Sequence, residues 1–416
     1  MRIDNVIRYA IIPLGGLGTR LYPLTLETSK AMIRFLNRPL IEFIILKLVT
    51  QGVKEIYLGV SGYVNYRNVY DYLGEGYRIS SKYGLPNSFR VRYQPLEDSV
   101  GNADSVRIVI EYYDLKDPFI VVQGDTVFDA DLADLWRHHV EKEAFMTIVL
   151  KELENVEDIK EFGVAIVDPD LRIRGFVEKP KRLEEAPSRS VNTGIYLFSE
   201  EFTSFIRSPE ILEMRKRGEM DFGRDIIPKL IREGKRVYGY TKIRYWFDIG
   251  SPKRLLEASL YLMRVLDPEE LEVTETWNGV KLQGKSARSR ALHRDIIERA
   301  EKKIIVFEGE VLVGRHVYIG DHAKIRDSVI DNYTIISNGA TIEGSIVMDR
   351  SFIGKGSVII NSIIGRHVKI GNNVFIEGSV VGDDARIGDN SRIIKSKIWP
   401  HKELDPGVVI ENMVFK

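Results

Sequence analysis

PLGGLGTRLYPLTLETSK, residues 13–30, follows the apolar run VIRYAII of residues 6–12. The run has the composition of a buried strand, and the glycines after it indicate a turn. LIEFIILKLV, residues 40–49, has apolar residues at spacings of three and four, which predicts a helix that Gly52 ends. IYLGV, residues 56–60, then predicts a second strand. Strand, glycine-rich turn, helix and strand make a βαβ unit, which predicts a parallel sheet.

Later apolar runs continue this alternation. They are FIVV at 119–122, MTIVL at 146–150, GIYLF at 194–198 and RVYGY at 236–240. We therefore expect an α/β fold, with a Rossmann-like mixed, mainly parallel open sheet and helices on both faces. Ligands of such sheets collect at the carboxyl ends of the strands. The glycine turn and GDT, residues 124–126, both lie at such ends.

An internal repeat occupies the last quarter of the chain. Its positions are Val313, Ile319, Ile325, Ile330, Ile336, Ile342, Val347, Ile353, Ile359, Ile364, Ile370, Ile376, Val381, Ile387, Ile393 and Ile398. They advance by six, six and five, so the period is 17 residues. Three β-branched residues in each coil, often followed by glycine, predict a prism-shaped parallel β-helix of hexapeptide type, which we expect to be left-handed.

The length predicts at least two domains, because 416 residues exceed one ordinary core. We expect an α/β domain over residues 1–260, a linker region over 261–310 and the β-helix over 311–416. The linker region mixes helical stretches, such as 295–303, with loops that the sequence does not place.

Composition narrows the classes of function. Lys plus Arg and Asp plus Glu both number 60, and no basic patch carries interleaved aromatics, so we expect no nucleic-acid or membrane partner. The chain has no cysteine, which excludes disulfides and thiolate chemistry. No apolar run reaches the roughly 20 residues that span a bilayer. We expect a cytoplasmic protein.

The glycine turn matches neither common phosphate motif. A dinucleotide fingerprint needs a third glycine where Leu21 stands, and a P-loop needs Gly-Lys-Ser/Thr where Gly18 is followed by Thr19 and Arg20. The turn still suits a phosphate chain, since glycine N–H groups can approach an anion and Arg20 offers bidentate donors. Lys30 adds a second positive charge. Taken alone, the glycine cluster favours the simpler interpretation, a strand-to-loop turn with a solvated arginine and lysine.

A longer stretch resembles a known signature. GGLGTRLYPLTLETSKAM is similar to the motif of the sugar-1-phosphate nucleotidylyltransferases, G-G-x-G-T-R-L-x-P-L-T-x-x-x-P-K-P-M. QGDTVF, GFVEKPK, SVNTGIYLF, MDFGRDIIP and YWFDIGSP follow in the family's order, so the resemblance covers about residues 6 to 265. Ser29 and Ala31 replace the usual prolines, Leu14 a small residue and Asn102 a threonine. None of these departures removes a charge.

The resemblance implies a role for particular residues. Arg20, Lys30 and Asp125 would be catalytic, and Asp125 with Asp248 would bind Mg²⁺. The nucleotide-binding positions would be Leu14, Gly15, Gly16, Gly18, Thr19, Gln94, Gly101, Asn102 and Gly124. The sugar-phosphate-binding positions would be Gly163, Glu178, Lys179, Asn192 and Thr193. Taken separately, GD, EKP and NTG are ordinary turns.

The implied reaction joins a nucleoside triphosphate to a sugar-1-phosphate and releases pyrophosphate, by direct attack on the α-phosphorus. Separate motifs resemble different members, and FVEKPK with the tail KIWPHKELDPGVVI favours GTP with mannose-1-phosphate, giving GDP-mannose. UTP or dTTP, or ATP, with glucose-1-phosphate is the alternative. We expect a homo-oligomer, formed through the β-helix or the catalytic domain.

Two functions of another class stay open. The chain could be a regulatory subunit that binds a sugar nucleotide without making it, although Arg20, Lys30 and Asp125 favour catalysis. The β-helix could instead carry an acyltransferase with a histidine base. It has four histidines, His316, His322, His367 and His401, which we expect on the surface of the coils.

Overall fold

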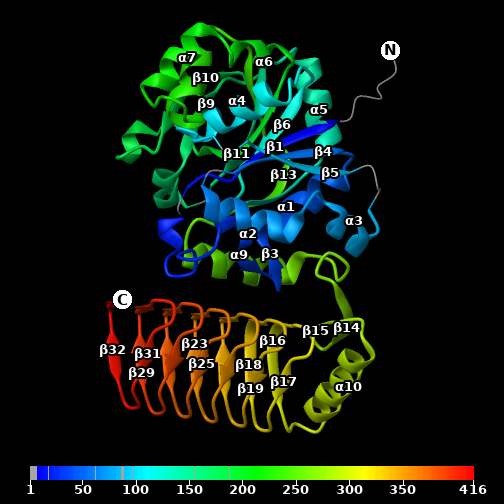
Figure 1. Ribbon diagram of the computed structural model, residues 1–416, viewed down its shortest axis with the longest axis vertical. Helices are drawn as coiled ribbons and strands as arrows, with labels where there is room; N and C mark the ends of the chain where they lie inside the picture. Colours follow the sequence, from blue (N-terminus) through cyan, green and yellow to red (C-terminus); the bar gives the residue numbers. More distant parts are fainter. Residues whose placement is uncertain are drawn as a thin grey trace. The chain divides into compact units, whose positions relative to one another are not determined.

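Residues 7–16, 18–60, 62–85, 89–95, 97–153, 155–186 and 188–416 are described by a computed structural model. The chain divides into two compact units (Figure 1). The first contains Met1–Gly16, Ser29–Met32 and Leu40–Asp248. The second contains Leu17–Thr28, Ile33–Pro39 and Ile249–Lys416. The stretch around the glycine turn is therefore shared between the units.

A nine-stranded sheet forms the centre of the first unit, in the order β10-β9-β11-β6-β1-β4-β5, with β8 beside β11 and β12 beside β8 (Figure 1). The strands are β1 (Tyr9–Pro13), β4 (Glu55–Gly59), β5 (Arg90–Tyr93), β6 (Phe119–Val122), β8 (Met146–Glu152), β9 (Gly163–Val167), β10 (Ile173–Glu178), β11 (Ser190–Phe198) and β12 (Val237–Tyr240). β1 pairs parallel with β4 and β6, whereas β11 runs antiparallel to its neighbours. The predicted mixed, mainly parallel sheet is confirmed.

Helices cover both faces of this sheet because its central strands are apolar on both sides. Ile12 of β1 packs in one core with residues of α1, and Ile11 packs in the other core with residues of α4. The helices are α1 (Leu40–Val49), α2 (Tyr63–Leu73), α3 (Tyr77–Tyr83), α4 (Asn102–Tyr112), α5 (Leu132–Glu141), α6 (Glu201–Phe205), α7 (Pro209–Lys216) and α8 (Ile227–Arg232). No helix in the described part of the chain is long and apolar enough to cross a membrane.

The second unit contains the predicted parallel β-helix (Figure 1). All sixteen repeat positions are at most 3% exposed, and residues 17 apart stack in register, such as Ile325, Ile342 and Ile359. The three rows continue to Leu404, Ile410 and Phe415. A row here is a set of strands that stack on one another from coil to coil. After the first strand of each row, the strands are two to three residues long, because each coil turns three times in 17 residues. β18 (Lys324–Ile330) is the exception.

Their bounds follow the repeat. They are β17 (Tyr318–Ile319), β19 (Ile335–Ile336), β20 (Thr341–Glu343), β21 (Ile346–Val347), β22 (Phe352–Ile353), β23 (Val358–Ile360), β24 (Ile363–Ile364), β25 (Lys369–Ile370), β26 (Phe375–Glu377), β27 (Val380–Val381), β28 (Arg386–Ile387), β29 (Arg392–Ile394), β30 (Lys397–Ile398), β31 (Glu403–Leu404), β32 (Val409–Glu411) and β33 (Val414–Phe415).

A ladder of buried serines joins successive coils. Ser345 and Ser362 donate their hydroxyl hydrogens to the carbonyl oxygens two residues earlier, at 2.7 Å in both cases. Each hydroxyl oxygen then accepts the N–H of the residue 17 positions later, at 3.0 Å. Small hydroxyl side chains therefore satisfy backbone groups that the narrow coil would otherwise bury without partners.

Residues 261–310, expected to be a linker region, are ordered and belong to the second unit. They contain the end of α9 (Pro252–Val265), the hairpin β14 (Val273–Trp277) and β15 (Val280–Gln283), α10 (Ala287–Glu301) and the start of β16 (Val306–Val313). β15 pairs parallel with β16, and Ile296 of α10 packs against the β-helix core. Segments without the 17-residue period therefore extend the first coils of the β-helix. The boundary between the two units falls after Asp248.

Candidate active site

The glycine turn begins where β1 meets the ends of both neighbouring strands. Leu14 N–H donates to the Gly59 carbonyl at 2.8 Å, and Gly124 N–H donates to the Pro13 carbonyl at 3.2 Å. A Cβ on Gly124 would lie 2.1 Å from Leu14 Cδ2 and 3.1 Å from the Pro13 carbonyl oxygen, so a larger residue would displace the Leu14 side chain. Gly15 is different, because apart from its two chain neighbours no described residue has an atom within 4 Å of its Cβ position. A ligand can approach the backbone at Gly15.

Three charged side chains converge beside this turn. Asp125 lies between β6 and β7 (Thr126–Ala130), and Asp248 ends β13 (Ile243–Asp248). β13 pairs antiparallel with β7 so that Asp248 stands opposite Thr126, the residue after Asp125. Lys30 begins the short helix η2 (Lys30–Met32). Its Nζ atom donates a hydrogen bond to Asp125 Oδ2 and lies 3.9 Å from Asp248 Oδ1.

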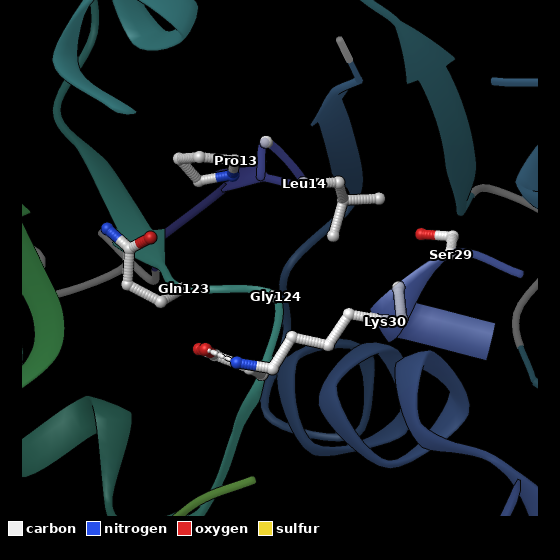
Figure 2. Close-up of a pocket in the computed structure, with 9 residues that line it drawn as sticks. Pro13, Leu14, Ser29, Lys30, Gln123 and Gly124 are labelled. Atoms are coloured by element: carbon white, nitrogen blue, oxygen red, sulfur yellow. Dashed lines mark hydrogen bonds and ion pairs between the residues drawn. The ribbon is translucent and has the colours of Figure 1, made fainter. Parts of the chain in front are cut away.

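Most of these groups share one hollow, of about 40 Å³, in the first unit. It is lined by Pro13, Leu14, Gly15, Ser29, Lys30, Ala31, Gln123, Gly124 and Asp125. In Figure 2 the Lys30 side chain reaches across it towards the backbone at Gly124. The structure therefore brings together Leu14, Gly15, Lys30, Gly124 and Asp125, all of which the sequence had selected.

Opposite charge controls the protonation of this cluster. Burial alone would raise the pKa of Asp125, but the ammonium of Lys30 outweighs it, so the pKa lies below the ordinary aspartate value. Asp125 is therefore ionised at neutral pH. Within the described residues, no group of three or more His, Asp or Glu side chains gathers in metal-binding geometry. The hollow offers the Asp125 carboxylate, the Lys30 ammonium and the open backbone at Gly15. The Asp248 carboxylate lies 3.9 Å from that ammonium but does not line the hollow.

The rest of the glycine turn belongs to the second unit. Gly18 has φ +60°, a conformation that favours glycine, and Thr25 Oγ1 donates to its carbonyl at 2.8 Å. The short helix η1 (Thr19–Leu21) follows and carries Arg20, which is exposed. The Thr25 hydroxyl therefore stabilises the turn through this hydrogen bond. Thr25 was not predicted to be a site residue.

Gln94, Gly101 and Asn102 lie outside the hollow of Lys30 and Asp125. Gln94 is 2% exposed, and its Oε1 accepts from Ser105 at 2.7 Å. A Cβ on Gly101 would lie 2.3 Å from the Met220 carbonyl oxygen. Asn102 Oδ1 accepts the N–H of Phe222 at 2.9 Å. These contacts give the three residues a packing role, and their contact with a nucleobase stays a prediction.

Two of the predicted sugar-phosphate residues, Gly163 and Lys179, lie beside a third, Glu178. In the β9–β10 hairpin Glu178 pairs with Gly163, whose Cβ would stand 2.6 Å from Glu178 Oε2. A Cβ on Gly223 would stand 2.2 Å from the same atom. Burial, reinforced by Asp221, raises the pKa of Glu178 above the usual glutamate value, although Lys179 opposes this. Lys179 Nζ lies 3.7 Å from Glu178 Oε1.

Gly223 and Asp221 were missed as site residues. The motif MDFGRDIIP, residues 220–228, contained them, but no role had been assigned to it. Asn192 lies at an irregularity of β11, where its Nδ2 donates to Tyr196 Oη at 2.8 Å and its Oδ1 accepts from Gly194 N–H at 2.9 Å. Thr193 points into the core, since it is 1% exposed and donates to the Val149 carbonyl.

The four histidines of the β-helix occupy corners of its coils. His316, His367 and His401 have φ between +55° and +59°, and His322 has φ +61°. Residues 17 apart along the first corner, such as Tyr333, share this conformation. The corner geometry accounts for the positions of the histidines, and no observation here favours acyl transfer.

Comparisons with known proteins agree with this geometry. Residues 9–264 match the family described as nucleotidyl transferase, and residues 307–414 match the GMPPB C-terminal domain. The chain is 29% identical to a UTP–glucose-1-phosphate uridylyltransferase of Synechocystis, covering 84% of each chain. It is 26% identical to a mannose-1-phosphate guanylyltransferase of Mycobacterium tuberculosis, covering 80% of this chain and 82% of that one. A solved Bacillus anthracis glucose-1-phosphate thymidylyltransferase, itself described as putative, shares the fold, with a TM-score of 0.53, 23% identity and coverage of 64% of this chain and 99% of that one.

Proposed function

Because the chain belongs to the nucleotidyl transferase family, we propose that it joins a nucleoside triphosphate to a sugar-1-phosphate and releases pyrophosphate. One observation carries the proposal. The Lys30 ammonium lies between Asp125 and Asp248, beside a glycine turn whose backbone is open to a ligand. Nucleotidyl transfer needs such a meeting of positive charge, carboxylates and backbone donors around a triphosphate.

The chemistry is a direct displacement. A phosphate oxygen of the sugar-1-phosphate attacks the α-phosphorus of the nucleotide. The bond from that phosphorus to the oxygen bridging the β-phosphate breaks, and pyrophosphate leaves with this oxygen. No side chain becomes bonded to substrate, so the protein contributes positioning and charge. Lys30 and Arg20 hold the negative charge that builds on the transferring group, while the glycine N–H groups bind the phosphate chain.

Asp125 and Asp248 would hold Mg²⁺. The donor set fits, because both carboxylates face one cationic group, the Lys30 ammonium, and Asp125 stays ionised. Mg²⁺ in such enzymes takes one or two carboxylates together with substrate phosphates. When bound, it would neutralise charge on the triphosphate and orient it.

Glu178 supports the proposed sugar subsite. Its carboxylate is held between Gly163 and Gly223, and a buried carboxylate is suited to accept hydrogen bonds from sugar hydroxyls. Lys179 places a positive charge beside it for the phosphate of the sugar. Asn192 is fixed by Tyr196 and Gly194, which keeps its amide orientation constant.

GTP and mannose-1-phosphate are our first choice of substrates, giving GDP-mannose. The match of residues 307–414 and the guanylyltransferase relative support this pair. UTP with glucose-1-phosphate is the second choice, supported by the uridylyltransferase relative. The homo-oligomer expected from the sequence stays a prediction, which light scattering checks.

One assay tests the proposal. The purified chain is incubated with Mg²⁺, each of ATP, GTP, UTP and dTTP, and mannose-, glucose- or N-acetylglucosamine-1-phosphate, and pyrophosphate release is measured. We expect release to be fastest with GTP and mannose-1-phosphate. A different best pair would correct the substrate alone. Absence of release with every pair, together with binding of a sugar nucleotide, would replace catalysis by the regulatory function.

A further inference from the structure

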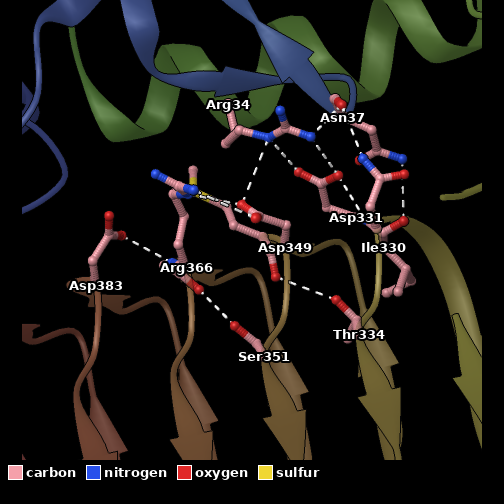
Figure 3. Close-up of polar contacts among 12 residues, drawn as sticks. Arg34, Asn37, Ile330, Asp331, Thr334, Asp349, Ser351, Arg366 and Asp383 are labelled. Atoms are coloured by element: carbon pink, nitrogen blue, oxygen red, sulfur yellow. Dashed lines mark hydrogen bonds and ion pairs between the residues drawn. The ribbon is translucent and has the colours of Figure 1, made fainter. Parts of the chain in front are cut away.

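The hairpin that follows Lys30 is clamped to the β-helix. The hairpin strands are β2 (Arg34–Phe35) and β3 (Arg38–Pro39), and both belong to the second unit. Arg34 donates from Nε to Asp331 Oδ2 and from Nη2 to Asp331 Oδ1, at 2.7 Å each (Figure 3). This bidentate geometry fixes the plane of both groups, which a single contact would not do.

The acidic partner is buried. The Asp331 side chain is 1% exposed, and that of Arg34 is 17% exposed. Asp331 Oδ1 also accepts the N–H of Asn332 at 2.6 Å. A buried carboxylate that loses its cation is left uncompensated, so this pair holds its partners firmly, unlike an exposed ion pair.

The turn of the hairpin is held as well. Asn37 Nδ2 donates to Gln283 Oε1 at 3.0 Å and to the Ile330 carbonyl at 3.1 Å. Asn332 Nδ2 donates back to the Asn37 carbonyl at 3.3 Å, and Arg34 Nη2 donates to the same carbonyl. The hairpin is therefore bonded at its first strand and at its turn, to side chains and backbone of the β-helix.

The clamp continues into the next coils. Arg34 Nε lies 3.8 Å from Asp349 Oδ1, which also accepts from Arg366 Nε at 2.8 Å. Asp383 Oδ1 then accepts the Arg366 backbone N–H at 2.9 Å. Figure 3 shows this row of charged groups along successive coils. The hairpin is thus attached to a rigid stack rather than to one loop.

We propose that Arg34 and Asp331 are positioning residues for Lys30, because the clamp restrains the backbone that leads back to this lysine. η2, which begins with Lys30, ends at Met32, and only Ile33 separates it from Arg34. With Arg34 held, few backbone torsions remain free between the clamp and Lys30. This inference rests on the proposed function, because Lys30 matters only if the reaction uses its charge.

The test is a double-mutant cycle in the full-length chain. Pyrophosphate release is measured for wild type, Arg34→Lys, Asp331→Asn, Lys30→Ala, and each clamp variant combined with Lys30→Ala. Loss of positioning should lower kcat about 10- to 100-fold, with a smaller change in KM, because a misplacement of about 1 Å is enough for this. In the Lys30→Ala background the same clamp variants should change kcat less than about twofold, since groups acting as one unit are not additive.

A matched variant separates positioning from general destabilisation. Ser362→Ala removes a buried hydrogen bond of the same β-helix, away from the hairpin. It should lower the Tm while kcat at 25 °C stays unchanged. A second readout needs no activity: amide hydrogen exchange of peptides covering residues 29–39 should be faster in Asp331→Asn than in wild type, and unchanged in Ser362→Ala.

Each outcome decides between the two proposals. Equal loss of kcat from the clamp variants with and without Lys30 would overturn positioning and leave the proposed function standing. So would unchanged hydrogen exchange of residues 29–39. If the wild type releases no pyrophosphate with any substrate pair, the proposed function fails and the positioning role fails with it.

Discussion

The Nζ atom of Lys30 lies 3.9 Å from Oδ1 of Asp248, although the two residues come from opposite ends of the first unit's sequence. The β13–β7 ladder brings Asp248 there, and η2 brings Lys30. Burying two carboxylates around one ammonium costs desolvation free energy, and an apolar cluster of the same size would be as stable. These charges are therefore better explained by a role in catalysis than by a role in stability. The arrangement therefore makes definite predictions for each carboxylate.

Asp125→Asn and Asp248→Asn should each lower kcat by about 100-fold or more, because each removes a negative charge proposed to hold Mg²⁺. Steady-state pyrophosphate release at saturating Mg²⁺ measures this. Circular dichroism should remain that of the wild type, since asparagine keeps the shape of aspartate.

Asp129→Asn is the matched control for these variants. Asp129 lies on β7, four residues after Asp125, and bonds to a lysine, Lys47, outside the hollow. It should retain kcat within about twofold, because its carboxylate does not line the hollow. Near wild-type turnover of Asp125→Asn, or an equal loss in Asp129→Asn, would contradict the metal assignment.

Glu178→Gln should raise KM for the sugar-1-phosphate about tenfold, with kcat less affected, because it weakens ground-state hydrogen bonds to sugar hydroxyls. Burial raises the pKa of Glu178, so its carboxylate takes up a proton at higher pH than an exposed glutamate. In the wild type, KM should therefore rise as the pH falls, starting above the ordinary glutamate range. The Gln variant should lack this rise.

Glu185→Gln is the control for that measurement, since Glu185 pairs with Arg182 at the surface. Its KM profile should follow the wild type. A pH profile of Glu178→Gln that is identical to that of the wild type would exclude Glu178 as the titrating group.

Much of the fold was predictable from the sequence because its signals are local and periodic. The predicted helix over residues 40–49 coincides with α1, and the predicted strand over 119–122 coincides with β6. The 17-residue period located the coils, since only a residue facing the narrow axis is restricted to Ile and Val. α10 and the β14–β15 hairpin cap the β-helix without sharing the period, so periodicity could not assign them.

The candidate site was predictable only in part. Gly124 and Asp125 follow a strand in a motif, so their position at the end of the sheet could be expected. Gly223 beside Glu178 depends on a contact between distant segments, which no local pattern encodes. The attachment of Arg34 to Asp331 is of the same kind, because an arginine in a hairpin gives no indication of a buried partner almost three hundred residues later.

His401 should titrate above the ordinary histidine value. Its Nε2 lies 2.9 Å from both carboxylate oxygens of Glu27, and this hydrogen bond raises its pKa, with Asp384 and Asp383 adding to the effect. The pair is exposed, so we expect it to contribute less than about 1 kcal/mol to the free energy of unfolding. That stabilisation is fully present below the pKa that His401 has in the unfolded chain, and it is lost as the pH rises through the pKa that His401 has in the folded chain.

An NMR titration of the histidine ring measures this directly. Glu27→Gln should lower the His401 pKa towards 6.5, the ordinary value. Because Glu27 belongs to the segment 17–28 that carries Arg20, the same titration reports whether this segment stays attached to the last coils. An unchanged His401 pKa in Glu27→Gln would show that the contact does not persist in solution.

Asp383→Asn should stabilise the protein at neutral pH. Burial raises the pKa of Asp383 to about 6. Between about pH 4 and 6 the Asp383 carboxyl is therefore protonated in the folded chain and ionised in the unfolded chain. The stability of the wild type should therefore rise as the pH falls through this window, and the carboxylate should cost about 1–3 kcal/mol at pH 7. Asparagine keeps the acceptor for Arg366 N–H, as Asn332 does for Arg315 N–H at the equivalent corner three coils earlier, at 2.9 Å in both cases.

Urea unfolding of wild type and Asp383→Asn at pH 4.5 and 7.5 measures this difference. The variant should have the higher midpoint at pH 7.5, and the two should approach each other at pH 4.5, where the wild-type carboxyl is protonated. Asp389→Asn is the control, because Asp389 accepts the N–H of Asn372 in the same way but at an exposed corner. A lower midpoint of Asp383→Asn at pH 7.5 would mean that attraction to Arg366 outweighs the cost of burial.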